Sequence, residues 1–133
     1  MRGLAVLGLA ATLAGCATAA PPAQPPIAGP EWRLEDLAGG GIIDNSHVTL
    51  MLGPEGRASG HGGCNRFFGS WTQTGSAISL GQMGSTKMAC AEALMNQENK
   101  YLNALASAGA YSFDATGALI VTTAAGPLKF RKD

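Results

Sequence analysis

Hydrophobic and polar residues alternate along most of the chain, which is the period-two pattern of strands that bury one face. The alternation first appears at Trp32 and Leu34, which lie between charged residues. Similar short stretches follow, and glycine, proline or aspartate ends most of them, as expected for turns. The pattern predicts strands at residues 31–37, 47–52, 57–61, 68–74, 77–80, 82–88, 110–113, 119–123 and 128–131.

Residues 91–108 change to a helical period and predict the only convincing α-helix. Gly109 follows at the position of a C-terminal cap. Glu98 falls within the apolar stripe and should therefore face inward or lie at the edge of the stripe. The apolar members of this stripe are Leu94, Met95, Tyr101, Leu102 and Leu105.

Many short strands with a single late helix indicate the α+β class with a mostly antiparallel sheet. One helix cannot cover both faces of a flat sheet with this many strands. The sheet is therefore expected to curve into a partly closed β-barrel, with the helix packed over its opening.

The N-terminus has the features of an export signal. Arg2 precedes a short apolar run that is followed by Leu13-Ala14-Gly15-Cys16. These four residues resemble a bacterial lipobox, which implies that residues 1–15 are a lipoprotein signal peptide and that Cys16 is acylated. An ordinary signal peptide cut nearby is the alternative.

Residues 16–30 are expected to form a lipidated tether, and residues 31–133 the folded domain. The tether is rich in proline and alanine, which favour extended conformations. Ala17 stands where Gram-negative lipoproteins that stay in the inner membrane usually carry aspartate. By that resemblance the anchor belongs to the outer membrane of the cell envelope and faces the periplasm.

Charge gives no sign of a nucleic-acid partner. The chain has nine basic and nine acidic residues, and removal of residues 1–15 takes away Arg2. No basic stripe is present that could neutralise phosphates. No cofactor motif is evident either, and none is expected.

Export also fixes the expected state of the cysteines. With Cys16 acylated, Cys64 and Cys90 remain as one pair in an oxidising compartment, which predicts a disulfide. Two alternatives use the same residues. Cys64 could be a nucleophile with His47 or His61 as its base, or the two histidines and two cysteines could bind zinc. Neither is favoured, because the second cysteine is available to Cys64 and no zinc-binding spacing is present.

Cys64 lies within a glycine-rich corner at residues 61–66, which we expect to bind Glu98. An unpaired buried carboxylate is costly, so Glu98 needs hydrogen-bond donors. The backbone around Gly63 and the side chains of Asn65 and Arg66 are candidates, and Lys87 is another. Glu98 would then fix the helix to the sheet. A general acid or base role is less favoured, because no nucleophile or second carboxylate is evident beside it.

Three motifs together resemble the META/HslJ-like domain family. They are Gly63-Cys64-Asn65-Arg66-Phe67, then Thr86-Lys87-Met88-Ala89-Cys90, then Leu94-Met95-Asn96-Gln97-Glu98. Ala91 and Ala93 depart from the pattern, because many members carry proline near the helix start. The resemblance implies a small curved barrel-like domain with one helix, common on bacterial envelope proteins. Some members are associated with heat stress, and a parasite member with motility and virulence. No catalytic residue or ligand comes with it.

The expected function is therefore that of a non-enzymatic envelope lipoprotein, acting as an interaction or stress-related accessory module. The alternative is a carrier that holds a lipid-like or apolar small molecule inside the barrel. Phe67, Phe68 and Trp71 either line a binding surface or fill the core. A cavity of several hundred cubic ångströms would favour the carrier. A filled core with an apolar surface patch would favour the interaction module.

Overall fold

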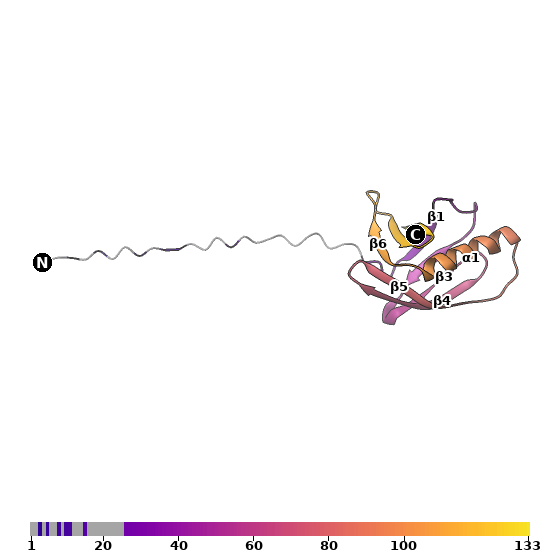
Figure 1. Cartoon of the computed structure of the whole chain (residues 1–133), viewed down its shortest axis with the longest axis horizontal. Helices are drawn as coiled ribbons and strands as arrows, with labels where there is room; N and C mark the ends of the chain where they lie inside the picture. Colours follow the sequence, from indigo (N-terminus) through magenta and orange to yellow (C-terminus); the bar gives the residue numbers. More distant parts are fainter. Residues whose placement is uncertain (1–2, 4, 6–7, 9, 12–14, 16–25) are drawn as a thin grey trace.

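The computed structural model describes residues 26–133 continuously, together with residues 3, 5, 8, 10, 11 and 15. The described part contains eight strands, one α-helix and a short 3-10 turn at Pro54–Gly56 (Figure 1). No helix in this part is long and apolar enough to cross a membrane. The elements are β1 (Glu31–Leu37), β2 (Thr49–Leu52), β3 (Arg57–His61), β4 (Arg66–Thr74), β5 (Ala77–Ser85), α1 (Glu92–Ala106), β6 (Ala110–Phe113), β7 (Leu119–Thr123) and β8 (Gly126–Lys132).

The strands form a closed antiparallel barrel in sequence order, with β8 pairing back to β1. This confirms the predicted α+β barrel with one helix. The barrel is closed most weakly between β5 and β6, because Ala77↔Ala110 is the single residue pair that joins these two strands. The helix α1 packs against β5 beside this seam and covers the end of the barrel there (Figure 1).

The separate strand predicted at residues 82–88 is wrong, because β5 runs without a break from Ala77 to Ser85. Gln82 adopts a left-handed conformation with φ of 51°. The register with β4 shifts at this place, between Phe68 and Ser70. A bulge of this kind interrupts the alternation of side chains, and for that reason one strand looks like two in the sequence.

Large side chains fill the barrel interior. Tyr101 of α1 lies at its centre, with ring centroids 5.7 Å from Phe67 and 6.3 Å from Phe130. Its hydroxyl donates a hydrogen bond to the carbonyl oxygen of Thr49 at 2.9 Å. Burial raises the pKa of Tyr101 well above its usual value, so the hydroxyl stays protonated and remains a donor. The other fully buried large side chains include Trp32, Leu34, Leu50, Leu52, Leu105, Leu119 and Leu128.

Packing begins before the boundary expected at residue 31. Ile27 is buried in the core, and its carbonyl oxygen accepts a hydrogen bond from Nε1 of Trp32 at 2.9 Å. Ala28 forms an isolated parallel bridge with Leu52. The surrounding prolines give this segment the composition of the tether, although the buried Ile27, the bond from Trp32 and the bridge to Leu52 hold it against the barrel.

The turn between β6 and β7 is organised by Asp114. Its Oδ1 accepts hydrogen bonds from the hydroxyl of Thr116 at 2.6 Å and from the N–H groups of Thr116 and Ala118 at 2.8 and 3.0 Å. Lys129 adds an ion pair at 3.7 Å. These donors, the Thr116 hydroxyl foremost, lower the pKa of Asp114 to about 2.

Candidate functional site

The glycine corner, residues 61–66, is the sharp connection between β3 and β4. The N–H of Gly62 donates to the carbonyl oxygen of Asn65 at 2.8 Å, and Gly63 has a φ of 109°. A Cβ atom on Gly62 would lie 2.5 Å from Oε1 of Glu98. Glycine is therefore required here because α1 packs directly against the backbone of the corner.

Glu98 is held by the corner through three hydrogen bonds. Its Oε1 accepts the N–H of Asn65 at 2.6 Å and that of Cys64 at 3.3 Å. Its Oε2 accepts Nδ2 of Asn65 at 2.9 Å. Only 5% of Glu98 is exposed, so these bonds satisfy a carboxylate that is removed from water. The arrangement attaches the middle of α1 to the β3–β4 connection.

Asn65 extends this network to the segment that follows β5. Its Oδ1 accepts hydrogen bonds from the hydroxyl of Thr86 at 2.9 Å and from the N–H of Met88 at 2.7 Å. Because Nδ2 donates to Glu98, both ends of the amide are engaged. The orientation of the Asn65 side chain is therefore fixed by its partners.

The predicted disulfide is present and joins Cys64 to Cys90, with their Cα atoms 6.0 Å apart. It ties the corner to the segment just before α1. With both sulfurs in this bond, a Cys64 nucleophile lacks its thiolate and the zinc alternative lacks two ligands. Among the described residues, no group of three or more metal-ligating side chains converges.

Four other residues named from the sequence take no part in the hydrogen bonds to Glu98. Arg66 is exposed at the start of β4. Nζ of Lys87 lies 3.4 Å from Oγ of Ser85, not against Glu98. Nδ1 of His61 lies 3.0 Å from the carbonyl oxygen of His47, so the two histidines contact each other at the surface.

The buried face of α1 is rotated from the predicted stripe, because Met95 is exposed and Leu94 and Leu102 are half-buried. Gln97, which lies outside the predicted stripe, is buried instead. Its Oε1 accepts the N–H of Ile43 at 2.8 Å, and its Nε2 donates to Oγ of Ser46 at 3.1 Å. Gln97, Tyr101 and Leu105 are spaced by four residues and therefore lie on one face of the helix. This spacing was the signal available in the sequence.

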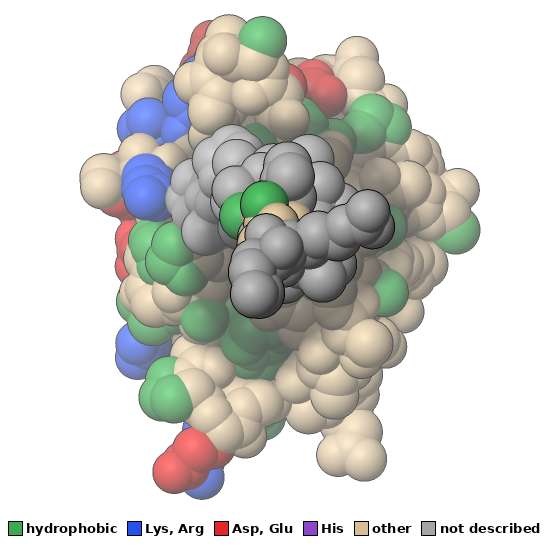
Figure 2. Space-filling view, turned by 90° about the vertical axis from the view of Figure 1, so that its left-hand side faces the viewer, with side chains coloured by type: hydrophobic (Ala, Val, Ile, Leu, Met, Phe, Trp, Pro, Cys, Tyr) green, Lys and Arg blue, Asp and Glu red, His purple; other side chains and the backbone are tan. Residues whose placement is uncertain are grey.

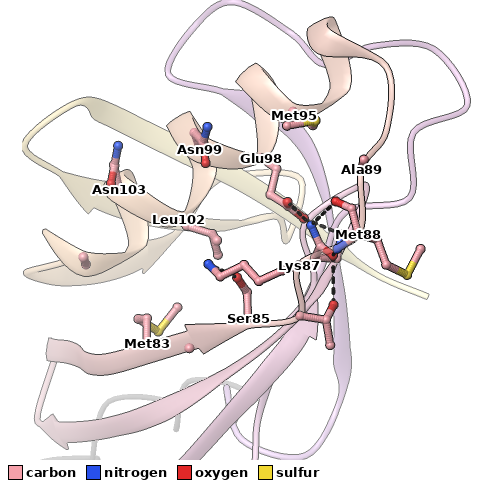
Figure 3. A pocket seen from close by; sticks show the side chains of 14 residues that line it. Met83, Ser85, Lys87, Met88, Ala89, Met95, Glu98, Asn99, Leu102 and Asn103 are labelled. Atoms are coloured by element: carbon pink, nitrogen blue, oxygen red, sulfur yellow. Dashed lines mark hydrogen bonds between the residues drawn. The ribbon is translucent and has the colours of Figure 1, made fainter.

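A groove of about 540 Å³ lies between α1 and the end of β5 (Figure 3). We call it the helix–strand groove. Met88, at its rim, is 61% exposed, and Met95 is exposed on the helix side. Methionine side chains adapt to differently shaped partners, which is why they are frequent at binding surfaces. The groove is lined by Asn65, Met83, Gly84, Ser85, Thr86, Lys87, Met88, Ala89, Met95, Glu98, Asn99, Leu102, Asn103 and Ala106.

The three aromatics expected at a surface or in the core are divided between the two. Phe67 is in the core. Trp71 is half-buried, and its Nε1 donates to the carbonyl oxygen of Gly53 at 2.8 Å. Phe68 is 57% exposed and covers Gly84 on the outer face of the barrel. On the face shown in Figure 2, the visible hydrophobic side chains are interspersed with polar and charged ones, and basic side chains gather along one side.

Fold and site together define a small barrel domain whose one helix is fixed by a disulfide and by a buried carboxylate. Residues 25–133 match the META domain family, and the chain therefore belongs to it. None of the curated proteins compared with the chain matches it.

Two solved structures are similar to this chain. One is the NMR structure of a protein from Burkholderia xenovorans, which is 27% identical, with a TM-score of 0.63, over 80% of this chain and 83% of that one. The other is an NMR structure that is 24% identical, with a TM-score of 0.62, over 77% of this chain and 87% of that one. The second likeness concerns the fold alone.

Proposed function

We propose that this protein is a lipid-anchored component of the bacterial envelope whose META domain is a non-enzymatic interaction module. The proposal rests on the position of the concave space, which lies outside the barrel. The interior of the barrel is occupied by Tyr101 and its neighbours, whereas the helix–strand groove opens to solvent. A domain with a filled core and an open, methionine-rimmed groove is suited to binding another macromolecule.

The carrier alternative is supported less. A carrier needs an apolar cavity that can enclose most of its ligand. Here Phe67, Tyr101 and Phe130 are fully buried against one another at the position that such a ligand would take. The Tyr101 hydroxyl would also lose its acceptor on Thr49 if the ring moved aside.

The membrane anchor is proposed from the N-terminal motif, because Cys16 lies outside the described residues. The Cys64–Cys90 disulfide is consistent with export, since such bonds persist in oxidising compartments. We place the domain on the outer membrane, facing the periplasm, with a stress-related accessory role as one use of the module.

The anchor is tested by Cys16→Ser. Removal of the acylation site should release the protein from the membrane fraction and leave it uncleaved at this position, since acyl chains supply the membrane affinity. Ala17→Ser is the matched control and should be processed normally. Cell fractionation and intact mass of the two variants decide the matter. Full membrane retention of Cys16→Ser with a normal mature mass would contradict the anchor.

The interaction role is tested by placing a photo-cross-linking amino acid at Met88, at the rim of the groove. Met51 is the matched control, because it is a methionine that is 36% exposed but lies on β2, outside the groove. In living cells, cross-linked adducts should form from Met88 and not from Met51. Equal adducts from both positions, or none from Met88, would contradict an interaction module that uses this groove.

A further inference from the structure

One edge of β5 has no strand partner over much of its length. On the side away from β4, its strand pairing in the described residues is limited to Ala77↔Ala110. The N–H of Thr86 donates to the carbonyl oxygen of Arg66 on β4, at 3.0 Å. Because backbone groups alternate along a strand, the N–H and C=O of Ser85 face the opposite edge. Gly84 pairs with Phe68, so the C=O of Met83, on the other side of the peptide bond to Gly84, faces that edge as well.

This unpaired edge borders the helix–strand groove. Figure 3 shows Met83 and Ser85 on the strand at one side, and Leu102 on the helix pointing toward them from the other. An extended chain in this space could pair its backbone with the edge of β5. Alternate side chains would then contact Leu102 and Met83. This is the geometry by which peptides add as a strand to a sheet.

The charge of the groove indicates what kind of chain fits. Its charged lining residues are Lys87 and Glu98. The carboxylate of Glu98 is already compensated by three N–H donors, and the residue is buried. Lys87 is exposed, and its ammonium group lies beside Ser85, next to the free edge. The charge available to a ligand is therefore positive.

We propose that the helix–strand groove binds an extended acidic peptide segment of a partner protein, which pairs with Met83 and Ser85 and places a carboxylate near Lys87. The inference rests on the proposed interaction function and names its ligand. A second copy of this chain fits less well. Two barrels joined through their β5 edges would bring both α1 helices into the same space, because α1 packs beside that edge in each copy.

The experiment begins with selection of random heptapeptides, displayed on phage, against the oxidised full chain in mild detergent. Selected peptides should combine strand-forming residues with aspartate or glutamate. A bound peptide should slow hydrogen exchange at the amide of Ser85, whose N–H faces the free edge. Lys87→Glu should weaken binding roughly tenfold, because an attraction becomes a repulsion. Lys100→Glu is the matched control, since Lys100 is exposed but lines a different groove. It should leave the Kd within about twofold. N-methylation of the peptide backbone should abolish binding.

Several results would overturn the proposal: no selected peptide, selection of basic or helical peptides, equal loss in the two lysine variants, or protection of amides away from β5. A dimer that protects the same amide would assign the edge to a second copy and would also overturn it. If peptide selection fails while Met88 still cross-links in cells, the interaction module stands and the acidic strand-addition mode falls.

Discussion

Replacement of Glu98 by leucine or by glutamine separates hydrogen bonding from packing. Leucine removes the acceptor of three buried hydrogen bonds, from the N–H groups of Cys64 and Asn65 and from Nδ2 of Asn65. The two N–H groups lose their acceptor, whereas Nδ2 keeps a longer bond to the carbonyl oxygen of Met88 at 3.4 Å. Each unsatisfied donor costs about 1–3 kcal/mol. Burial of the leucine side chain returns about 1.5–3 kcal/mol. We expect a net loss of about 2–5 kcal/mol in the free energy of unfolding.

Glutamine retains an oxygen for the two backbone donors, but its amide then faces Nδ2 of Asn65, donor against donor. Asn65 cannot reverse its amide, because Oδ1 already accepts from Thr86 and Met88. One hydrogen bond is lost, at about 1–2 kcal/mol. Glu98→Gln should therefore be less stable than the natural chain but more stable than Glu98→Leu.

Urea unfolding of the oxidised proteins at pH 7 measures the order. The control is Glu92→Gln, in the exposed first turn of the same helix, which should change stability by no more than about 0.5 kcal/mol. If the leucine variant equals or exceeds the glutamine variant in stability, the hydrogen bonds of Glu98 do not attach the helix to the corner and the reasoning is refuted.

Three further predictions concern stability. Replacement of Cys64 and Cys90 by alanine opens a cross-link across a sequence separation of 26; urea unfolding should show a loss of about 3.5 kcal/mol, and a loss below about 1 kcal/mol would contradict this. Asp114 has a pKa of about 2, lowered from 3.8. The contribution of Asp114 to stability should be complete above about pH 4 and lost as the pH falls toward 2. The Asp114→Asn variant should lack this pH dependence. An NMR titration that finds an ordinary pKa for the Asp114 carboxyl group would disprove the prediction. Gly62→Ala should lose about 1–3 kcal/mol, because its Cβ would overlap the buried carboxylate of α1. At Gly109, where a Cβ would meet nothing within 4 Å, the same change should be nearly neutral.

The alternation of side chains was sufficient to predict most of the barrel, because strands that bury one face leave a clear record in the sequence. Trp32 and Leu34 are both in the core, as their spacing indicates. The exceptions have local causes. The bulge at Gln82 breaks the alternation within β5. Ile27 is hidden among prolines, although it packs against Trp32.

The position of the helix was predictable, but its apolar residues alone did not give its rotation. Hydrophobic spacing alone places Met95 inward, but in the structure Met95 is exposed and Gln97 is buried. Gln97 can be buried because the loop after β1 supplies hydrogen-bond partners for its amide. The burial of Glu98 followed from its place in the stripe. Which donors reach it depends on the shape of the glycine corner, so Asn65 is a partner while Lys87 is not.

The helix–strand groove could not be predicted, because it depends on where β6 begins. β6 starts only at Ala110, after the helix, so it meets β5 near one end of that strand. An exposed strand edge is a liability that natural proteins usually cover. Here α1 is fastened on two sides, by Gln97 to the loop after β1 and by Glu98 to the glycine corner. These two attachments hold α1 beside the edge of β5. In the proposed mode of binding, the contacts that stabilise the domain also preserve the space for the extended peptide.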